Sequence, residues 1–233
     1  MLTVRQFRYA ADNLAYLIHG DREAIAVDGG AVTAICDYIR EAGLTLTAVT
    51  HTHAHPDHTS GTRDLVRRTG AKTLDHRELA RAGRVEIGGE PVAVLATPGH
   101  TTDSVCYYTG DALVSGDTLF NGTVGNPFSG DLDAFYDSIQ RLLALPDATI
   151  VYGGHDYVRE SMAFARELTP ENPAIDRYLA AYDPAHVRST LADERAVDPY
   201  LRFDAPEIVA LLEGRGLPVE TSRQRWHAVM TLG

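Results

Sequence analysis

The amino-acid sequence predicts an α/β (α+β) fold, with one mixed domain followed by a small helical region. The first third alternates short β-type runs with helical patterns, and the middle is rich in short β-branched or aromatic runs. From residue 157 onward, the spacing of apolar residues is mainly helical. Hydrophobic residues make up 44% of the 233 positions, which is enough for one sizeable core.

The first third is expected to contain three short strands, a helix, a fourth strand and a short helix. Turn residues separate the strands, and Gly29-Gly30 ends the third of them. The longer helix is indicated by apolar residues at positions 32, 35, 36 and 39, which share one helical face. In chain order, these elements are expected at residues 3–10, 14–19, 24–28, 31–41, 44–50 and 61–70.

The middle of the chain predicts further strands, and the end predicts helices. Strands are expected at residues 85–87, 92–97, 104–109, 112–116 and 149–152, and Pro146 ends a helix over residues 132–145. Helical spacing follows at residues 158–168, 174–182, 206–214 and 222–232. The composition changes near residue 156, which predicts a main domain over 1–156 and a helical subdomain without strands over 157–233.

Charge and composition exclude several classes of partner. The 21 Lys+Arg and 32 Asp+Glu give a net charge of −11, which argues against nucleic-acid binding because phosphate contacts need clustered basic residues. Cys36 and Cys106 are expected to be free thiols. The N-terminus lacks a basic-then-apolar leader, and no apolar run reaches the ~18 residues of a membrane span. We therefore expect a cytoplasmic monomer or small homo-oligomer without a membrane partner.

A histidine-rich segment directly follows the predicted strand that ends at Thr50. It reads His51-Thr52-His53-Ala54-His55-Pro56-Asp57-His58. Imidazole is the commonest zinc ligand, and carboxylate joins it readily. Side chains two positions apart in an extended loop point the same way, so His53 and His55 can hold one ion. Asp57 and His58 follow where the chain turns into a helix, and they can hold a second ion.

Three more candidate ligands, His100, Asp117 and His155, each follow a predicted strand and a glycine. Glycine lets the backbone turn sharply and approach a site closely. Strand ends at one edge of a sheet are where sites collect in α/β proteins. Together with the histidine-rich segment, these residues predict a metal site.

The other histidines are interpreted as supporting or ordinary residues. His51 could share the face of His53 and His55, but we interpret it as a residue that supports the ligands or the fold. The remaining four have neither the spacing nor the flanking residues of ligands, and we interpret them as surface or hydrogen-bonded core residues: His19, His76, His186 and His227.

At these motifs the sequence resembles the metallo-β-lactamase superfamily, and within it the glyoxalase II (hydroxyacylglutathione hydrolase) group. The metal motifs that carry the resemblance are residues 52–58 (THAHPDH), 97–101 (TPGHT), 115–120 (SGDTLF) and 154–157 (GHDY). Downstream segments resemble the helical region of glyoxalase II at residues 164–175 (FARELTPENPAI), 189–194 (STLADE) and 198–202 (DPYLR). The resemblance therefore runs along almost the whole chain.

The resemblance implies a αββα metallo-β-lactamase sandwich, with a binuclear metal site at one edge of a catalytic domain. It implies that Asp117 bridges two divalent metal ions, and Asp28 matches a structural aspartate of the fold. Zinc is the expected metal for this ligand set, with iron or manganese as alternatives. The implied ligands of the two ions are His53, His55 and His100 for one, and Asp57, His58 and His155 for the other.

Four residues are predicted to bind substrate, and two of them depart from the glyoxalase II pattern. Asn126 and Phe128 stand where that group usually has a Lys and a Tyr that help to hold glutathione. Tyr157 and Arg202 match other substrate-contacting positions, but a second basic residue after Arg202 is missing. Each lost charge-assisted contact to a carboxylate would weaken glutathione binding by ~1.5–3 kcal/mol.

The sequence thus predicts a metal-dependent hydrolase that cleaves S-2-hydroxyacylglutathione or a related small thioester. We expect a metal-bridging hydroxide to attack the acyl carbon, and Asp57 to be the catalytic residue that orients this hydroxide or moves its proton. The alternatives are hydrolysis of another acyl bond such as a lactone, a persulfide dioxygenase-like enzyme with one iron, and a non-enzymatic relic of the fold.

Overall fold

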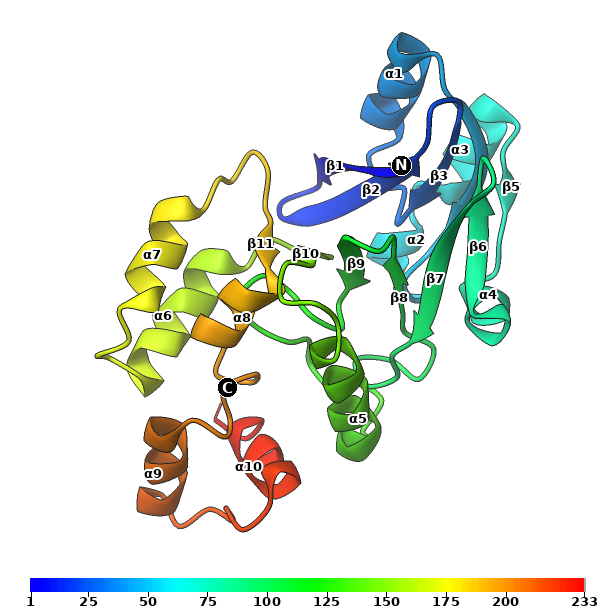
Figure 1. Cartoon of the computed structure of the whole chain (residues 1–233). Helices are drawn as coiled ribbons and strands as arrows, with labels where there is room; N and C mark the ends of the chain where they lie inside the picture. Colours follow the sequence, from blue (N-terminus) through cyan, green and yellow to red (C-terminus); the bar gives the residue numbers. More distant parts are fainter. Residues whose placement is uncertain (233) are drawn as a thin grey trace.

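Two β-sheets face each other in the computed structural model, which describes residues 1–232 (Figure 1). The first sheet has the strand order β1-β2-β3-β4-β5, and the second has the order β11-β10-β9-β8-β7-β6. The first sheet consists of β1 (Thr3–Tyr9), β2 (Asn13–His19), β3 (Glu23–Val27), β4 (Thr45–Thr50) and β5 (Lys72–Thr73). The second consists of β6 (Arg84–Ile87), β7 (Glu90–Ala96), β8 (Val105–Tyr108), β9 (Ala112–Gly116), β10 (Ile150–Gly153) and β11 (Ser189–Thr190).

Helices cover the outer faces of both sheets, and several of them follow the second sheet in the sequence. Those in the first part of the chain are α1 (Val32–Ala42), α2 (Pro56–Thr59), α3 (Thr62–Thr69), α4 (His76–Ala82) and α5 (Leu132–Leu143). Those in the last part are α6 (Val158–Leu168), α7 (Ala174–Ala181), α8 (Leu191–Val197), α9 (Pro206–Gly214) and α10 (Ser222–Val229). No helix within residues 1–232 is long and apolar enough to cross a membrane.

Alternation of side chains along the strands divides the core into three layers. On β2, Leu14 and Tyr16 pack between the two sheets, whereas Ala15 and Leu17 belong to the cluster that includes residues of α1 and α3. A third cluster fills the space between the second sheet and α5. Because both faces of each sheet are apolar, each sheet needs helices on its outer face. The predicted αββα sandwich is confirmed, with α1 and α5 on opposite outer sides (Figure 1).

The part of the chain after residue 156 contributes to the same sandwich. The sequence indicated only helices there, and this was wrong in one respect: β11 pairs with β10 through Val151 opposite Ser189 and Ile150 opposite Thr190. Trp226 of α10 is fully buried, with its ring 5.5 Å from that of Phe135 on α5. The domain boundary near residue 156 stays a prediction.

The sequence prediction missed four short elements, which have too few residues to show a periodic pattern. These elements are α4, α8, β5 and β11. The side chain of Asp75 accepts a hydrogen bond from the backbone N–H of Arg77 and caps α4. Thr190 and Asp193 form a reciprocal capping box at the start of α8. Both expected free thiols, Cys36 and Cys106, are confirmed as free.

The loops that carry the predicted ligands open at one edge of the two sheets. β3 and β4 are parallel, as are β9 and β10, so the carboxyl ends of each pair lie together. The loops after β4, β9 and β10 carry the residues 51–58, Asp117 and His155. The backbone N–H of Val105 donates to the carbonyl oxygen of Thr52 at 2.8 Å, which brings the β7–β8 loop with His100 to the same edge.

Tyr107 of β8 ties the second sheet to the start of the histidine-rich segment. This side chain is fully buried, and its hydroxyl lies 2.8 Å from the carbonyl oxygen of His51 and 2.9 Å from the Thr50 hydroxyl. It donates to the carbonyl and accepts from the threonine. A buried polar group that loses its only partner costs about 1–3 kcal/mol.

We therefore expect Tyr107→Phe to lower the free energy of unfolding by about 1–3 kcal/mol, because the His51 carbonyl loses its partner. Urea denaturation followed by circular dichroism measures the change. The matched control is Tyr108→Phe on the next position of the same strand, whose hydroxyl donates to Gly110 at an exposed site. It should change stability by less than about 0.5 kcal/mol. Equal effects of the two substitutions would contradict this account of Tyr107.

Candidate metal centre

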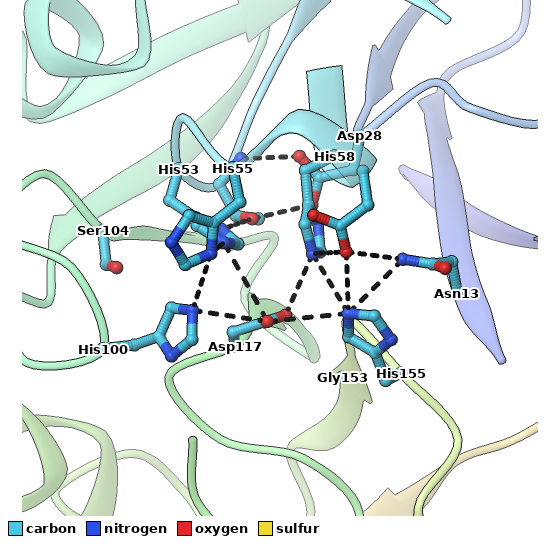
Figure 2. Close-up of polar contacts among 12 residues, drawn as sticks. Asn13, Asp28, His53, His55, His58, His100, Ser104, Asp117, Gly153 and His155 are labelled. Atoms are coloured by element: carbon cyan, nitrogen blue, oxygen red, sulfur yellow. Dashed lines mark hydrogen bonds and ion pairs between the residues drawn. The ribbon is translucent and has the colours of Figure 1, made fainter. Parts of the chain in front are cut away.

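Seven side chains converge at the shared edge of the sheets, in two groups that could each hold a metal ion. We call His53, His55 and His100 the three-histidine group, and Asp57, His58 and His155 the Asp57 group. Asp117 falls with the three-histidine group by distance, but it faces both groups. Figure 2 shows it between His100 on one side and His155 on the other. The structure therefore brings the seven predicted residues together from four different loops.

The three-histidine group brings three ring nitrogens together. Nδ1 of His55 lies 2.8 Å from Nε2 of His53 and 3.1 Å from Nε2 of His100. His53 and His100 are buried, and their burial lowers the pKa of His53 to about 4 and lowers that of His100. Both rings are therefore neutral at pH 7, which is the form that ligates a metal.

The Asp57 group is equally close. Nε2 of His58 lies 3.2 Å from Nε2 of His155. Oδ2 of Asp57 lies 3.5 Å from the former nitrogen and 3.3 Å from the latter. His58 is fully buried, whereas the Asp57 side chain is 46% exposed. This group therefore has one carboxylate that a small molecule from solvent can reach.

Asp117 lies between the two groups and contacts both. Its Oδ1 is 3.3 Å from Nε2 of His58, and its Oδ2 is 3.5 Å from Nε2 of His100 and 3.6 Å from Nε2 of His155. Oδ1 is buried and, apart from the His58 nitrogen, has no hydrogen-bond partner among residues 1–232. A buried carboxylate with so few partners is costly, and a position between two cations would satisfy it.

The partners outside the cluster fix the orientation of two imidazoles. Nδ1 of His100 lies 2.9 Å from the carbonyl oxygen of Asn126, which can only accept. Nδ1 of His155 lies 2.9 Å from a carboxylate oxygen of Asp12. Both rings therefore carry their proton on Nδ1, and each presents the lone pair of Nε2 to the cluster, as a metal ligand must.

The same reasoning applies to His53 through Thr52. The Thr52 hydroxyl donates to Asp28 at 2.7 Å, so it has only a lone pair left for Nδ1 of His53 at 3.0 Å. Nδ1 of His53 is the donor, and its Nε2 presents a lone pair to the cluster. The cluster therefore gathers more acceptors than donors, and the donor set fits divalent cations.

His58 differs from the other imidazoles because carboxylates lie on both of its sides. Burial lowers its pKa, but Asp28 and Asp117 outweigh burial and raise the pKa to about 11. In return, although burial opposes it, His58 lowers the pKa of Asp117 to about 2. Metal binding must displace the proton of His58, and a divalent ion gains more from the two carboxylates than a single proton does.

Glycine at position 154 lets the β10 loop approach this cluster. A Cβ atom there would lie 2.1 Å from Oδ1 of Asp117 and 2.9 Å from Cε1 of His58. Neither atom can move without disturbing both groups, so only glycine fits. This is the close approach that the Gly-Gly-His segment indicated.

The four predicted substrate-binding residues lie in different places. Phe128 is 69% exposed, and its ring centroid is 5.8 Å from that of His55 and 5.2 Å from that of His100. Asn126 is exposed and contacts His100 only through its backbone. Tyr157 stacks on His155 with centroids 5.1 Å apart and an angle of 4°.

Arg202 is not brought to the cluster by any contact of the described residues. Its guanidinium is paired with Glu207, and it lines a cavity between the end of α6 and the start of α9. That cavity contains none of the seven predicted ligands. Its role in substrate binding stays a prediction.

Several residues of the site had no signal in the sequence. Asp12 lies in the turn before β2, and Asn13, the first residue of β2, donates to Oδ2 of Asp57 at 2.9 Å. Tyr9 donates to the carbonyl oxygen of Asp57 at 2.9 Å. The sequence indicated only a turn at Asn13. His51 lies outside both groups, with Nε2 3.1 Å from the Thr62 hydroxyl.

Comparison with known proteins identifies the families that this chain resembles. Residues 9–87 and 82–155 match the metallo-beta-lactamase superfamily model, and residues 156–226 match the model described as hydroxyacylglutathione hydrolase C-terminus. A hydroxyacylglutathione hydrolase from Chromohalobacter salexigens is 34% identical over 93% of this chain and 92% of that protein. One from Thiobacillus denitrificans is 36% identical over 92% of this chain and 90% of that protein.

Solved structures show the same fold. ETHE1 from Myxococcus xanthus superposes with a TM-score of 0.69 at 26% identity, over 98% of this chain and 90% of that chain. The BLEG-1 B3 metallo-beta-lactamase superposes with a TM-score of 0.65 at 22% identity, over 85% of this chain and 99% of that chain. With both parts of the chain matched by family models and with curated relatives above 30% identity over nearly its whole length, this protein belongs to the metallo-β-lactamase superfamily and, within it, to the hydroxyacylglutathione hydrolase family.

Proposed function

We propose that this protein is a metal-dependent hydrolase that cleaves S-2-hydroxyacylglutathione or a related small thioester. The observation that carries the proposal is the convergence of seven candidate ligand side chains, with the buried carboxylate of Asp117 between the two groups. The curated relatives are named hydroxyacylglutathione hydrolases, and they match this chain over nearly its full length. Those names do not favour the two alternative substrates, a lactone or a persulfide.

We propose zinc as the metal: the three-histidine group and the Asp57 group would each hold one ion, and Asp117, which faces both groups, would be their shared ligand. Five of the seven candidate ligands are imidazoles, which suits zinc well. Bound divalent ions supply an acidified water, with a pKa toward ~7, and stabilise negative charge on the acyl oxygen. Both cysteines are free, which fits the reducing cytoplasm that we propose as the location.

Asp57 is the residue that we propose to orient the attacking water and to accept its proton. Although burial opposes it, His58 and Asn13 hold the pKa of Asp57 below its usual value. The carboxylate is therefore ionised at neutral pH and can accept a proton. Because it is also the exposed member of the cluster, it can face both the water and the substrate. A thiolate is a good leaving group, so the reaction needs no strong separate acid.

Phe128 and Tyr157 are the residues that we propose to contact the substrate beside the ligands. Phe128 lies beside His55 and His100 of the three-histidine group, and Tyr157 lies beside His155 of the Asp57 group. Burial raises the pKa of Tyr157 to about 12, so its hydroxyl is neutral and can donate a hydrogen bond. Asn126 and Arg202 remain proposed contacts to the thiol part.

Asp117→Ala tests the binuclear site. We expect the variant to lose most of its bound metal and at least about 100-fold in kcat/KM, because both groups lose their shared carboxylate. Metal content is measured by mass spectrometry, and turnover is measured with S-lactoylglutathione and with a chromogenic acetyl thioester. The control is Asp111→Ala, at the exposed opposite end of the same strand. Full activity and full metal content in Asp117→Ala would refute the bridging assignment.

Phe128→Ala tests the proposed substrate contact. Removing an aromatic ring that the substrate covers should cost about 1–2 kcal/mol of binding, which is roughly 5–30-fold in KM. The value of kcat should stay within about twofold, because the contact is the same in the ground state and the transition state. The matched variant Phe128→Tyr keeps the ring, so its KM should not rise. An unchanged KM in Phe128→Ala would show that the substrate does not cover this side chain.

A further inference from the structure

The two groups of ligands differ in the residues that stand behind their imidazoles. In the Asp57 group, Nδ1 of His58 lies 3.0 Å from a carboxylate oxygen of Asp28. Nδ1 of His155 lies 2.9 Å from a carboxylate oxygen of Asp12. Both imidazoles of this group are therefore supported by negative charge.

The three-histidine group has only neutral direct supports. Nδ1 of His53 donates to the Thr52 hydroxyl, and Nδ1 of His100 donates to a backbone carbonyl. Nε2 of His55 has no hydrogen-bond acceptor within residues 1–232, and its ring lies beside the exposed Phe128. This group also contributes no carboxylate of its own, apart from the Asp117 that both groups face.

Acceptor charge matters because a carboxylate behind an imidazole makes the ring a stronger metal ligand. The negative charge raises the basicity of the ligating nitrogen, fixes the tautomer and holds the ring in position. Loss of such a support typically weakens metal binding about 10–100-fold. The Asp57 group has two of these supports and one ligating carboxylate, whereas the three-histidine group has neither.

The turn between β1 and β2 is built to place Asp12 behind His155. The backbone N–H of Asp156 donates to the carbonyl oxygen of Asp12 at 3.0 Å, and that of Leu14 donates to Gly154 at 2.8 Å. These backbone bonds hold the turn against the loop that carries His155. The neighbouring Asn13, the first residue of β2, donates to Asp57, so Asp12 and Asn13 together contact two of the three members of the group.

We propose that the two metal sites are unequal: the Asp57 group binds its ion first and more tightly, and Asp12 is a positioning residue that sets this order. The proposal rests on the binuclear centre proposed above and adds the order of loading to it. Asp12 has a 40% exposed side chain, whereas Asp28 is fully buried. Solvent screens the charge of Asp12, so its effect should lie near the lower end of the range, about 10-fold.

The test is a stepwise zinc titration of the metal-stripped protein, in competition with a chromophoric chelator. The native protein should bind two ions with different dissociation constants. Asp12→Asn keeps the size of the side chain and removes the charge, and it should weaken the tighter ion about 10-fold. The weaker ion should change by less than about threefold. The matched control is Asp21→Asn, in the exposed turn at the other end of β2, which should change neither ion.

Two further variants assign the ions to the groups. His155→Ala should remove the tighter ion and leave a weak one, whereas His55→Ala should leave the tighter ion in place. Cobalt substitution gives a second readout, because the absorption bands of bound Co²⁺ change only where the surrounding ligands change. A merely structural effect of Asp12→Asn would weaken both ions alike and would lower the melting temperature of the metal-stripped protein.

The outcomes separate this proposal from the proposed function. Two ions of equal affinity, or a tighter ion that survives in His155→Ala and is lost in His55→Ala, would overturn the order of loading while leaving a binuclear hydrolase intact. Equal weakening of both ions in Asp12→Asn would overturn the role of Asp12. Failure of the native protein to bind two ions would instead refute the proposed function.

Discussion

The buried carboxylate of Asp28 is the interaction on which the rest of the site depends. It is fully buried, directly after β3, and its backbone has a positive φ of 53°. It accepts from the backbone N–H of Thr52 at 2.8 Å, from the Thr52 hydroxyl at 2.7 Å and from Nδ1 of His58 at 3.0 Å. A buried charge is tolerated only with partners of this kind. The carboxylate therefore fixes where the segment after β4 must run.

Through Thr52, Asp28 also affects the position of residues in the opposite sheet. The Thr52 side chain that Asp28 holds also packs against Gly116 at the end of β9, where a Cβ atom would lie 2.4 Å from the Thr52 hydroxyl. Gly116 has a positive φ of 51°, and the next residue is Asp117. The bridging carboxylate is thus positioned by close packing against the same threonine that orients His53. The buried carboxylate of Asp28 therefore helps to position both His53 and Asp117, which come from opposite sheets.

The sequence could predict the seven ligands because each lies beside a local signal: an H-x-H-x-D-H segment, or a glycine after a predicted strand. It could not predict Asp12 or Asn13, because their role depends on contacts across the fold. Asp12 contacts His155, which is 143 residues away in the sequence. Aspartate is common in turns, so its presence at this position does not by itself indicate such a contact. β2 could be predicted because it is a run of apolar residues bounded by turn residues. The two-residue strand β11 has no such run, because its partner β10 alone defines it.

The last third of the chain is part of the site's support as well as of the core. Glu194 of α8 is fully buried, and it accepts from the backbone N–H of Gly122 at 2.7 Å and from the hydroxyls of Tyr178 and Ser189. Gly122 lies in the loop that follows Asp117, and this loop also carries Phe120, whose ring contacts Tyr157 with centroids 5.2 Å apart. Removing the helical region would leave this loop without its buried acceptor. The helices after residue 156 therefore position the loop between the bridging carboxylate and the proposed substrate contacts, which gives a physical reason for the two matched family regions to occur in one chain.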